Sequence, residues 1–509
     1  MIAKLSDGVL LEIFDSYRQS FEHQPSYERN WNNKNGWFKL AHVCYNWRCI
    51  VLASSSRLQL RIFFTDRTPT RAAALTGLPP LPIIVDYLDA TWTVGSQKHL
   101  ASALRYPNRV CKVAMKITSS NCNMIAKALD CAFPTLETLE LHGTGAEGFR
   151  FPPTFLTTST KSLRQQKLPG ATLKSFPPLL SATTALVDLT LGIDTMFNLP
   201  RGVSLLAPLQ HLSSLRHLDV SVVSFHVPLT RAISSVKKDD VVSLPELTHF
   251  RFKGHTTYVE ELLAGLATPS LQNLRVTLYG GSDASRIPHL SVITRNMPMP
   301  FYAAQIKSTM GTHIISLLTH SHFLDDPPFN IFVLGPSAIA QVSSELSATL
   351  AAVEDLFFAF FLPSNHPGSP SVNLAPLRGF FEQLHNVKIL RVPHGLETEV
   401  ANVLREYNGQ PTTNHLPTVP DGTNLGATTS SDIPINPSRL NVGLFPSLEE
   451  IEIHPKYPGS RIPESRRAYA LESFEELVTA RQKAGRPVKV YWKTDQVLPT
   501  SFYDASDWW

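Results

Sequence analysis

The sequence predicts an α/β fold in which a short helical N-terminal domain precedes an irregular solenoid, with parallel strands on its concave face and helices outside. Three observations support this prediction. A short apolar pattern recurs along most of the 509 residues, prolines stand just before several of its copies, and the first 60 residues follow a helical pattern instead. This length allows about three domains or one long repeat array.

The recurring pattern is apolar-x-x-apolar-x-apolar, as in Leu136, Leu139 and Leu141. Between Val110 and Val387 its step averages about 28 residues, which lies in the range of leucine-rich repeats. Chance recurrence stays open for the weak copies at 110, 163, 301 and 329, but the regular spacing of the whole set argues against it. The copies begin at residues 110, 136, 163, 186, 215, 247, 271, 301, 329, 353, 387 and 448.

Each copy is expected to form a short strand with one buried face, because side chains alternate across a strand. A proline precedes the first apolar position by two residues at Pro134, Pro245, Pro269 and Pro446. Proline cannot continue a helix, so each one marks a turn from helix to strand. Helices are predicted between strands, for example at 123–131 and 259–266.

The predicted domains follow from this pattern. Residues 1–60 form a helical domain, 61–109 a connecting segment with the N-terminal cap, and 110–407 the solenoid. Residues 408–440 contain few apolar side chains and are expected to form a flexible insertion. Residues 441–509 hold the last repeat and a C-terminal cap, with a helix over 466–484 and an extended segment over 488–492.

Composition excludes several classes of protein. The chain has 46 basic and 42 acidic side chains, a net charge of +4, so neither nucleic acid nor an anionic membrane is an expected partner. No apolar run is long enough to span a bilayer, and acidic residues interrupt the first apolar segment. The five cysteines form no Cys-x-x-Cys pair and are expected to be reduced, which predicts a cytoplasmic or nuclear location.

The N-terminal domain is predicted to contain two amphipathic helices. Ser6 or Asp7 can cap the first. Its apolar stripe consists of Val9, Leu10, Ile13, Phe14 and Tyr17. The second helix runs from Trp37 to about residue 52, with a stripe of Leu40, Val43, Cys44, Trp47 and Val51. Two helices of about three turns cannot close a core alone, so they need the following segment and a partner.

These residues resemble the F-box motif. The resemblance rests on 5–14 (Leu-Ser-Asp-Gly-Val-Leu-Leu-Glu-Ile-Phe), then Leu40, Val43, Cys44 and Trp47, then 57–60 (Arg-Leu-Gln-Leu). The wider pattern is similar to fungal F-box proteins with leucine-rich repeats. The family motif has proline where Ser6 stands, an acidic residue where Gly8 stands, and a shorter gap than 21–36.

The resemblance implies a substrate receptor of an SCF-type (cullin-RING) ubiquitin ligase, which binds the Skp adaptor through the F-box and a client protein through the repeats. Implied adaptor-binding residues are Leu5, Val9, Leu10, Ile13, Phe14, Val43, Cys44 and Trp47. Two alternatives stay open: the N-terminal helices are only an apolar cap of the solenoid, or the protein is a scaffold that works without a ligase.

No enzymatic activity, cofactor or metal site is predicted. Residues 143–148 spell G-x-G-x-x-G, but Pro152 and Pro153 follow where a phosphate-binding loop needs a helix. The residues His313, His320, His322, Asp325 and Asp326 match no metal-ligand spacing.

The strand register predicts which side chains line the concave face. His249, Arg251, Lys253 and Arg275 would form a basic patch that receives an acidic or phosphorylated client segment, although an ordinary solvated charged face explains the same pattern. Ile331, Val333 and Phe357 would stand exposed on that face and indicate a partner or a covering loop.

Overall fold

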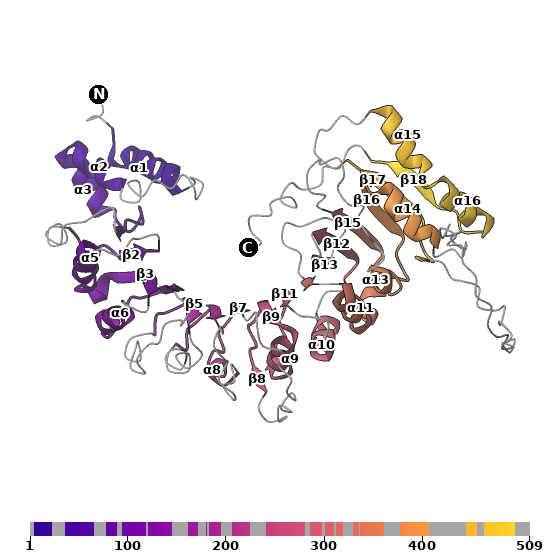
Figure 1. Ribbon diagram of the computed structural model, residues 1–509. Helices are drawn as coiled ribbons and strands as arrows, with labels where there is room; N and C mark the ends of the chain where they lie inside the picture. Colours follow the sequence, from indigo (N-terminus) through magenta and orange to yellow (C-terminus); the bar gives the residue numbers. More distant parts are fainter. Residues whose placement is uncertain are drawn as a thin grey trace, which may run out of the picture. The chain divides into compact units, whose positions relative to one another are not determined.

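The fold was analysed in a computed structural model, shown in Figure 1. The structure describes residues 5–22, 36–65, 78–88, 94–118, 121–144, 161–171, 180, 183–194, 206–223, 241–279, 286–297, 301–309, 312–318, 329–334, 336–360, 377–406, 444–455 and 463–493. The predicted flexible insertion at 408–440 lies outside these residues.

The chain divides into two compact units. Unit 1 contains residues 1–254 and 261–271, and unit 2 contains residues 255–260 and 272–509. The boundary falls inside the predicted solenoid, in the helix α9 (Thr256–Ala264). The domain boundaries expected from the sequence stay predictions, and each unit is described by itself.

Three helices form the N-terminal part of unit 1: α1 (Asp7–Glu22), α2 (Trp37–Val43) and α3 (Tyr45–Ala53). The prediction of one helix from Trp37 to about residue 52 was wrong, because the backbone of Cys44 is extended and separates α2 from α3. The break is stabilised locally: the Arg48 side chain donates to the Ala41 carbonyl at 2.9 Å, while its backbone N–H donates to the Cys44 carbonyl. The first bond satisfies a carbonyl that the end of α2 leaves free, and the second is the first hydrogen bond within α3.

Unit 1 contains a parallel sheet in which neighbouring strands follow in chain order. Its strands are β1 (Ile62–Phe64), β2 (Ile83–Tyr87), β3 (Val110–Thr118), β4 (Thr138–Thr144), β5 (Gln165–Ala171), β6 (Asp188–Asp194), β7 (His217–Val223) and β9 (His249–His255). The short strands β8 (Val242–Ser243) and β10 (Leu266–Ala267) pair with each other. The helices in the connections between these strands are α5 (Val94–Leu104), η3 (Pro107–Arg109), α6 (Cys122–Leu129) and α8 (Leu206–Leu209).

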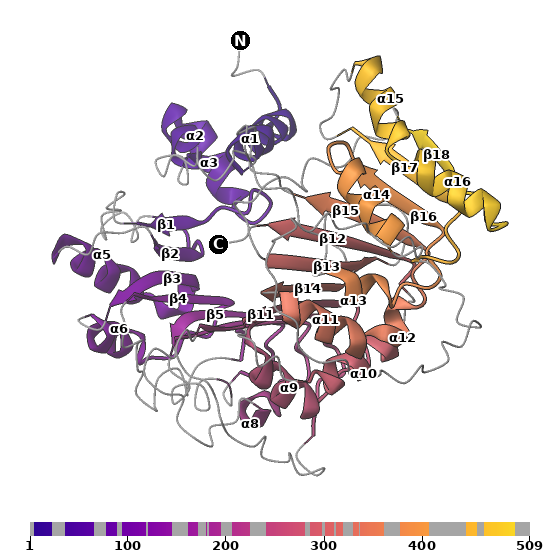
Figure 2. The same cartoon turned by 45° about the vertical axis from the view of Figure 1, so that its right-hand side comes forward.

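The predicted repeat pattern describes these strands well. A strong copy places its first apolar residue two positions before the strand, as Leu136 stands before β4. The next apolar positions are in register across the sheet, as Leu189 pairs with Leu218 and Leu218 with Phe250. These side chains are buried, and Figures 1 and 2 show α5 and α6 on one side of β2–β4.

The sheet begins earlier than the first predicted repeat. The segment 61–109, predicted as a connection and cap, contains β1, β2 and α5. The weak copy at 163 is also a strand, β5, and its middle position is the fully buried Gln166. Among the described residues, neither end of the Gln166 side-chain amide has a hydrogen-bond partner.

Unit 2 departs from the expected strand order. The predicted succession of parallel strands from 271 to 353 is wrong here, because β13 is antiparallel to both β12 and β14. The order is β11, β14, β13, β12, β15, β16, β17, β18, and the other pairs are parallel. The weak copies at 301 and 329 therefore form strands, but an antiparallel strand separates them and their order is exchanged.

The elements of unit 2 have the following bounds. Its strands are β11 (Asn273–Tyr279), β12 (Ala303–Thr309), β13 (Thr312–Leu318), β14 (Phe329–Leu334), β15 (Asp355–Phe360), β16 (Ile389–Pro393), β17 (Glu450–His454) and β18 (Lys489–Trp492). Its helices are α10 (Pro288–Asn296), α11 (Pro336–Glu345), α12 (Ser347–Leu350), α13 (Arg378–Phe381), α14 (Glu397–Glu406), α15 (Glu464–Glu472) and α16 (Glu475–Lys483).

The C-terminal part of unit 2 extends the sheet. The predicted helix over 466–484 is two helices, α15 and α16, and the predicted extended segment is β18, which pairs with β17. The buried guanidinium of Arg481 on α16 donates to the carbonyls of Leu444 and Phe445 at 2.7 and 2.6 Å. These bonds attach α16 to the turn before β17.

The predicted fold class is confirmed in its general form. The protein is an α/β protein with N-terminal helices and a long parallel sheet that is consistent with a solenoid-like repeat. Within the described residues, none of the helices has both the length and the apolar character that a membrane span requires.

Candidate protein-binding surfaces and a buried charge network

The first helix, α1, has apolar side chains on two different faces. Leu10 and Phe14 are buried at 2% and 0% exposure. Leu5, Val9 and Ile13, four residues apart, remain 39%, 47% and 44% exposed. Of the residues that the F-box resemblance implies, Leu10 and Phe14 therefore brace the helix from inside, whereas Leu5, Val9 and Ile13 form an exposed apolar stripe. Such a stripe is a typical feature of a protein-binding surface.

The second and third helices separate their implied adaptor residues in the same way. The Trp47 ring packs edge-on against Phe14, with ring centroids 4.8 Å apart, so Trp47 braces α1. The sulfur of Cys44 accepts the backbone N–H of Trp47 at 3.4 Å and caps α3. Val43 at the end of α2 is 58% exposed, and the neighbouring Tyr45 is 80% exposed. We call α1, α2 and α3 together the helical module. Val43 and Tyr45 are further exposed side chains of this module.

The helical module is attached to the rest of unit 1 by polar contacts as well as by packing. The Trp37 indole N–H donates to the Arg61 carbonyl at 2.9 Å, just before β1. The Arg57 guanidinium pairs with Glu12 on α1. The module therefore has a defined attachment to the chain that leads into the sheet.

The sheet of unit 1 has one open face, lined by polar side chains. Buried and exposed positions alternate along β9, as a strand with one buried face requires. On the open face, Glu140 accepts a hydrogen bond from His142 at 2.9 Å and lies 3.7 Å from the Lys112 ammonium group. The hydrogen bond from His142 lowers the pKa of Glu140, and Lys167 and Lys112 lower it further. The face therefore carries opposite charges that are partly paired.

The predicted client-binding residues fall in different surroundings. His249, Arg251 and Lys253 follow one another on the open side of β9 in unit 1, and the Arg251 guanidinium lies 3.9 Å from Asp219. Burial lowers the pKa of His249, and the neighbouring His217 lowers it further. Arg275 lies on β11 in unit 2, in register with Asn330. Arg251 is thus an exposed cation that is paired with an acidic residue, Asp219, on the neighbouring strand.

A pair of histidines stands on the same open face. Asp188, His217 and His249 occupy equivalent positions on β6, β7 and β9. The Nδ1 atom of His217 contacts a carboxylate oxygen of Asp188, and the rings of His217 and His249 lie with centroids 4.5 Å apart. The Nδ1 atom of His249 lies 2.9 Å from the Thr248 hydroxyl.

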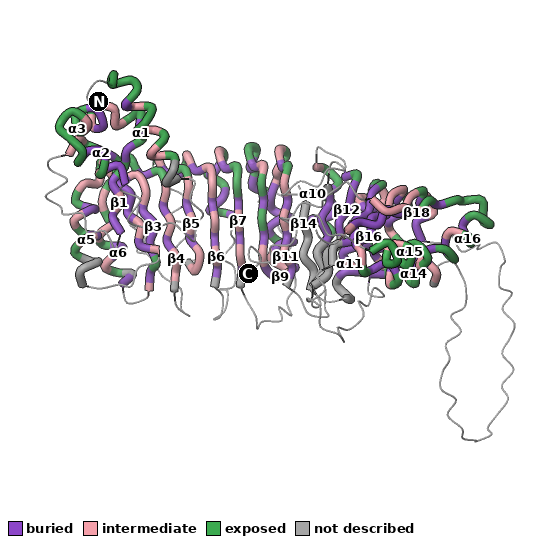
Figure 3. The backbone as a smooth tube through the Cα atoms, turned by 90° about the horizontal axis from the view of Figure 1, so that it is seen from above, coloured by how far each residue is buried: buried purple, intermediate pink, exposed green. Residues whose placement is uncertain are grey.

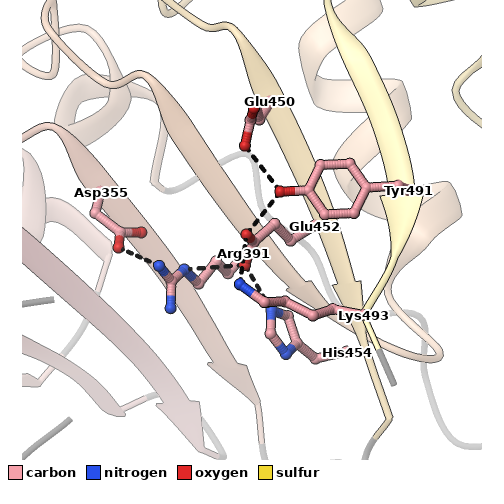
Figure 4. A network of polar contacts seen from close by, with 7 residues as sticks. All are labelled: Asp355, Arg391, Glu450, Glu452, His454, Tyr491 and Lys493. Atoms are coloured by element: carbon pink, nitrogen blue, oxygen red, sulfur yellow. Dashed lines mark hydrogen bonds and ion pairs between the residues drawn. The ribbon is translucent and has the colours of Figure 1, made fainter. Parts of the chain in front are cut away.

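Unit 2 contains a buried charge network where unit 1 has an open face. Figure 4 shows this network on four adjacent strands, β15 to β18. The Arg391 guanidinium lies 2.7 Å from Asp355 and 3.3 Å from Glu452. Glu452 also accepts from Tyr491 at 2.8 Å and from Lys493 at 2.9 Å. Its remaining contact is His454, whose Nε2 lies 3.0 Å away.

Burial controls the charges of this network. Asp355, Arg391, Glu452 and His454 are each less than 7% exposed. The contact of Asp355 with Arg391 is short but not angled as a hydrogen bond, and neither Asp355 oxygen has a hydrogen-bond partner in the part of the chain that the structure describes. Burial accordingly raises the pKa of Asp355 to about 6, although Arg391 opposes the shift. Burial also disfavours the charge of Glu452, but the hydrogen bonds from His454, Lys493 and Tyr491 outweigh it and lower its pKa to about 2.

The sequence prediction missed this network. The prediction that Phe357 is exposed on the concave face was wrong, because Phe357 is 3% exposed; the side chains of Ile331 and Val333 lie outside the described residues. The signal was present in the alternate positions of the last repeats: Asp355, Arg391 and Glu452 follow the same register as the polar residues of unit 1. Their burial could not be predicted, because it depends on what covers the second face of the sheet.

The other motifs of the sequence give no further site. Gly143 and Thr144 end β4, while 145–148 lie outside the described residues. His313 lies on β13. The other residues for which no metal-ligand spacing was found, His320, His322, Asp325 and Asp326, lie outside the described residues. Among the residues that the structure describes, no group of three or more His, Cys, Asp and Glu side chains is placed to hold a metal ion.

A comparison of the sequence with models of known protein families finds no match, and a comparison with the curated proteins finds none either.

Proposed function

We propose that the protein is a substrate receptor of an SCF-type ubiquitin ligase, in which the helical module binds a Skp-type adaptor and the repeat region binds a client protein. The observation that carries the proposal is the exposed apolar stripe formed by Val9 and Ile13 on α1 and by Leu5 just before the helix. These are three of the positions that the F-box resemblance assigns to the adaptor contact, and Val43 at the end of α2 is a fourth.

Physical reasoning supports an interface here. The module keeps its own core, formed by Leu10, Phe14, Ile50 and Val51, and still leaves the stripe in water. Covering apolar surface stabilises a complex by about 25 cal/mol per Å², so a partner that covers the stripe gains affinity. In this proposal the protein contributes recognition and proximity, and other subunits supply the transfer chemistry.

The open face of unit 1 is the proposed client surface. Arg251 and Lys253 provide positive charge there, and His249 lies beside them. An acidic or phosphorylated segment suits such a surface, because charge-assisted hydrogen bonds to carboxylates and phosphates are strong. The part of Arg275 in client binding stays a separate prediction for unit 2.

A pull-down of the full chain with purified Skp-type adaptor tests the proposal. The wild type and the Ser6→Pro variant, which restores the family residue, are both expected to bind. The double variant Val9→Asp with Ile13→Asp is expected to lose at least tenfold in affinity, since two charges would be buried in an apolar contact.

Val292→Asp on α10 is the matched control, because Val292 is a 52% exposed apolar residue of unit 2 and is expected to leave adaptor binding unchanged. Absence of binding by both the wild type and Ser6→Pro would refute the ligase assignment. Client capture without adaptor binding would instead favour the scaffold alternative.

A further inference from the structure

The histidine pair on the open face of unit 1 has an arrangement that ion pairing alone does not explain. His217 and His249 occupy directly paired positions on the neighbouring parallel strands β7 and β9. Their rings are tilted by 39° and lie 4.5 Å apart at the centroids. Both residues are exposed, so the two imidazoles lie side by side at the surface.

The contact with Asp188 determines which nitrogen of the neutral His217 ring carries the proton. The Asp188 carboxylate can only accept, so it holds the proton on Nδ1 of His217. The Thr248 hydroxyl donates its single proton to the Arg216 carbonyl at 3.2 Å. The same hydroxyl lies 2.9 Å from Nδ1 of His249, and which of the two groups donates depends on the tautomer of that ring.

His217 consequently presents the lone pair of Nε2, and His249 does so in the tautomer in which its Nδ1 donates to Thr248. No hydrogen bond to either Nε2 atom is found within the described part of the chain. In metal sites, a ligating histidine usually donates its other ring N–H to a carboxylate or another oxygen, which orients the ring and increases its basicity. Asp188 and Thr248 stand in these two supporting positions.

We propose that His217 and His249 bind one divalent transition-metal ion through their Nε2 atoms, with Asp188 and Thr248 as positioning residues. Imidazole ligands suit Zn²⁺, Ni²⁺ and Cu²⁺, and Cu²⁺ binds most tightly in this series. In the proposed site both Nε2 atoms bind the metal at the usual Zn–N distance of about 2.0–2.1 Å.

The described residues supply two protein ligands to the proposed site, and water completes the coordination in the free protein. The site is thus open on the solvent side, unlike a structural zinc site, which is closed by four protein ligands. It lies on the proposed client surface but does not depend on adaptor binding or on a client.

Titration of the full-length, chelator-treated protein with ZnCl₂ at pH 7.5, followed by calorimetry, tests the site. The wild type is expected to bind one more Zn²⁺ than the double variant His217→Gln with His249→Gln. Asp188→Asn keeps both ligands and is expected to weaken this event about tenfold, the usual effect of removing a carboxylate partner of a metal-bound histidine. His211→Gln is the matched control: His211 is an exposed histidine in the turn before β7 and should not affect binding.

Electron paramagnetic resonance with one equivalent of Cu²⁺ gives an independent measurement. Hyperfine coupling to two imidazole nitrogens is expected in the wild type and in His211→Gln, and its loss is expected in the double variant. The same zinc stoichiometry in the wild type and the double variant, or a copper signal unchanged by the double substitution, would overturn the proposal. Circular dichroism verifies that each variant is folded.

Discussion

The two units use the same kind of strand but place the second face of the sheet in different surroundings. In unit 1, buried and exposed residues alternate along β9. In unit 2, four consecutive residues of β16 and four of β17 are buried, so both faces of these strands are covered. Figure 3 shows this contrast along the chain.

The comparison shows that one sequence position can have two physical roles. Arg251 and Arg391 both lie between the buried apolar positions of a repeat strand, so their side chains are on the opposite face of the sheet. Both pair with an acidic residue on a neighbouring strand. Water solvates Arg251, so its ion pair adds little to stability. Arg391 has lost this water, so its partners Asp355 and Glu452 must replace it.

Replacement of the two arginines tests this difference most strongly. Arg391→Met is expected to cost about 3–5 kcal/mol, because it leaves Asp355 and Glu452 buried without the cation between them. The matched variant Arg251→Met should cost less than about 1 kcal/mol. Urea unfolding gives the free energies, and hydrogen exchange of peptides from β15–β18 and from β7 and β9 assigns them to the units. Equal costs for the two variants would contradict the comparison.

The pH dependence of unit 2 provides a second test. The pKa of Asp355 is about 6 in the folded protein against an ordinary value of 3.8, so between these values the folded state holds a proton that the unfolded chain has released. This contribution therefore decreases stability as the pH rises, by about 2 kcal/mol between pH 4.5 and 7.5.

Asp355→Asn should remove this dependence and make unit 2 more stable than the wild type at pH 7.5, with a smaller difference at pH 4.5. Hydrogen exchange of β15–β18 peptides at both pH values measures it. Glu452 does not interfere: its pKa is lowered to about 2, so the stability it contributes is lost only as the pH falls from about 4.5 towards 2. A variant that is less stable than the wild type at pH 7.5 would show that the Arg391 contact outweighs the cost of burial.

The smallest expected effect tests the buried face of unit 1. Gln166→Leu should stabilise the protein by about 1–2 kcal/mol, because the buried amide of Gln166, between its neighbours Leu139 and Leu189, has no hydrogen-bond partner among the described residues. Gln165→Leu, on the half-buried neighbouring position of the open face, should change stability by less than about 0.5 kcal/mol. A loss of stability in Gln166→Leu would indicate that the amide has a polar partner after all.

Much of the fold could be predicted from local pattern. The helix over 122–129, the strand ladder from β3 to β9 and the last strand β18 all follow from the spacing of apolar residues and the position of prolines. The break at Cys44 could not, because Val43, Cys44 and Trp47 fit one continuous helix, and the apolar spacing gives no sign of the bond from the Arg48 side chain to the Ala41 carbonyl that stabilises the break. The candidate adaptor residues were predicted as one group, and the structure divides them into bracing and exposed side chains.

Local chemistry encodes the period of the repeat: an apolar side chain at alternate strand positions requires one buried face, and this holds wherever the strand lies. Three other features depend on residues far apart in the chain. They are the strand order around β13, the burial of the Asp355–Arg391–Glu452 network, and the contact between the rings of His217 and His249. These features are determined by tertiary packing. Register, desolvation and the distance between side chains are properties of the packed strands and not of any single segment.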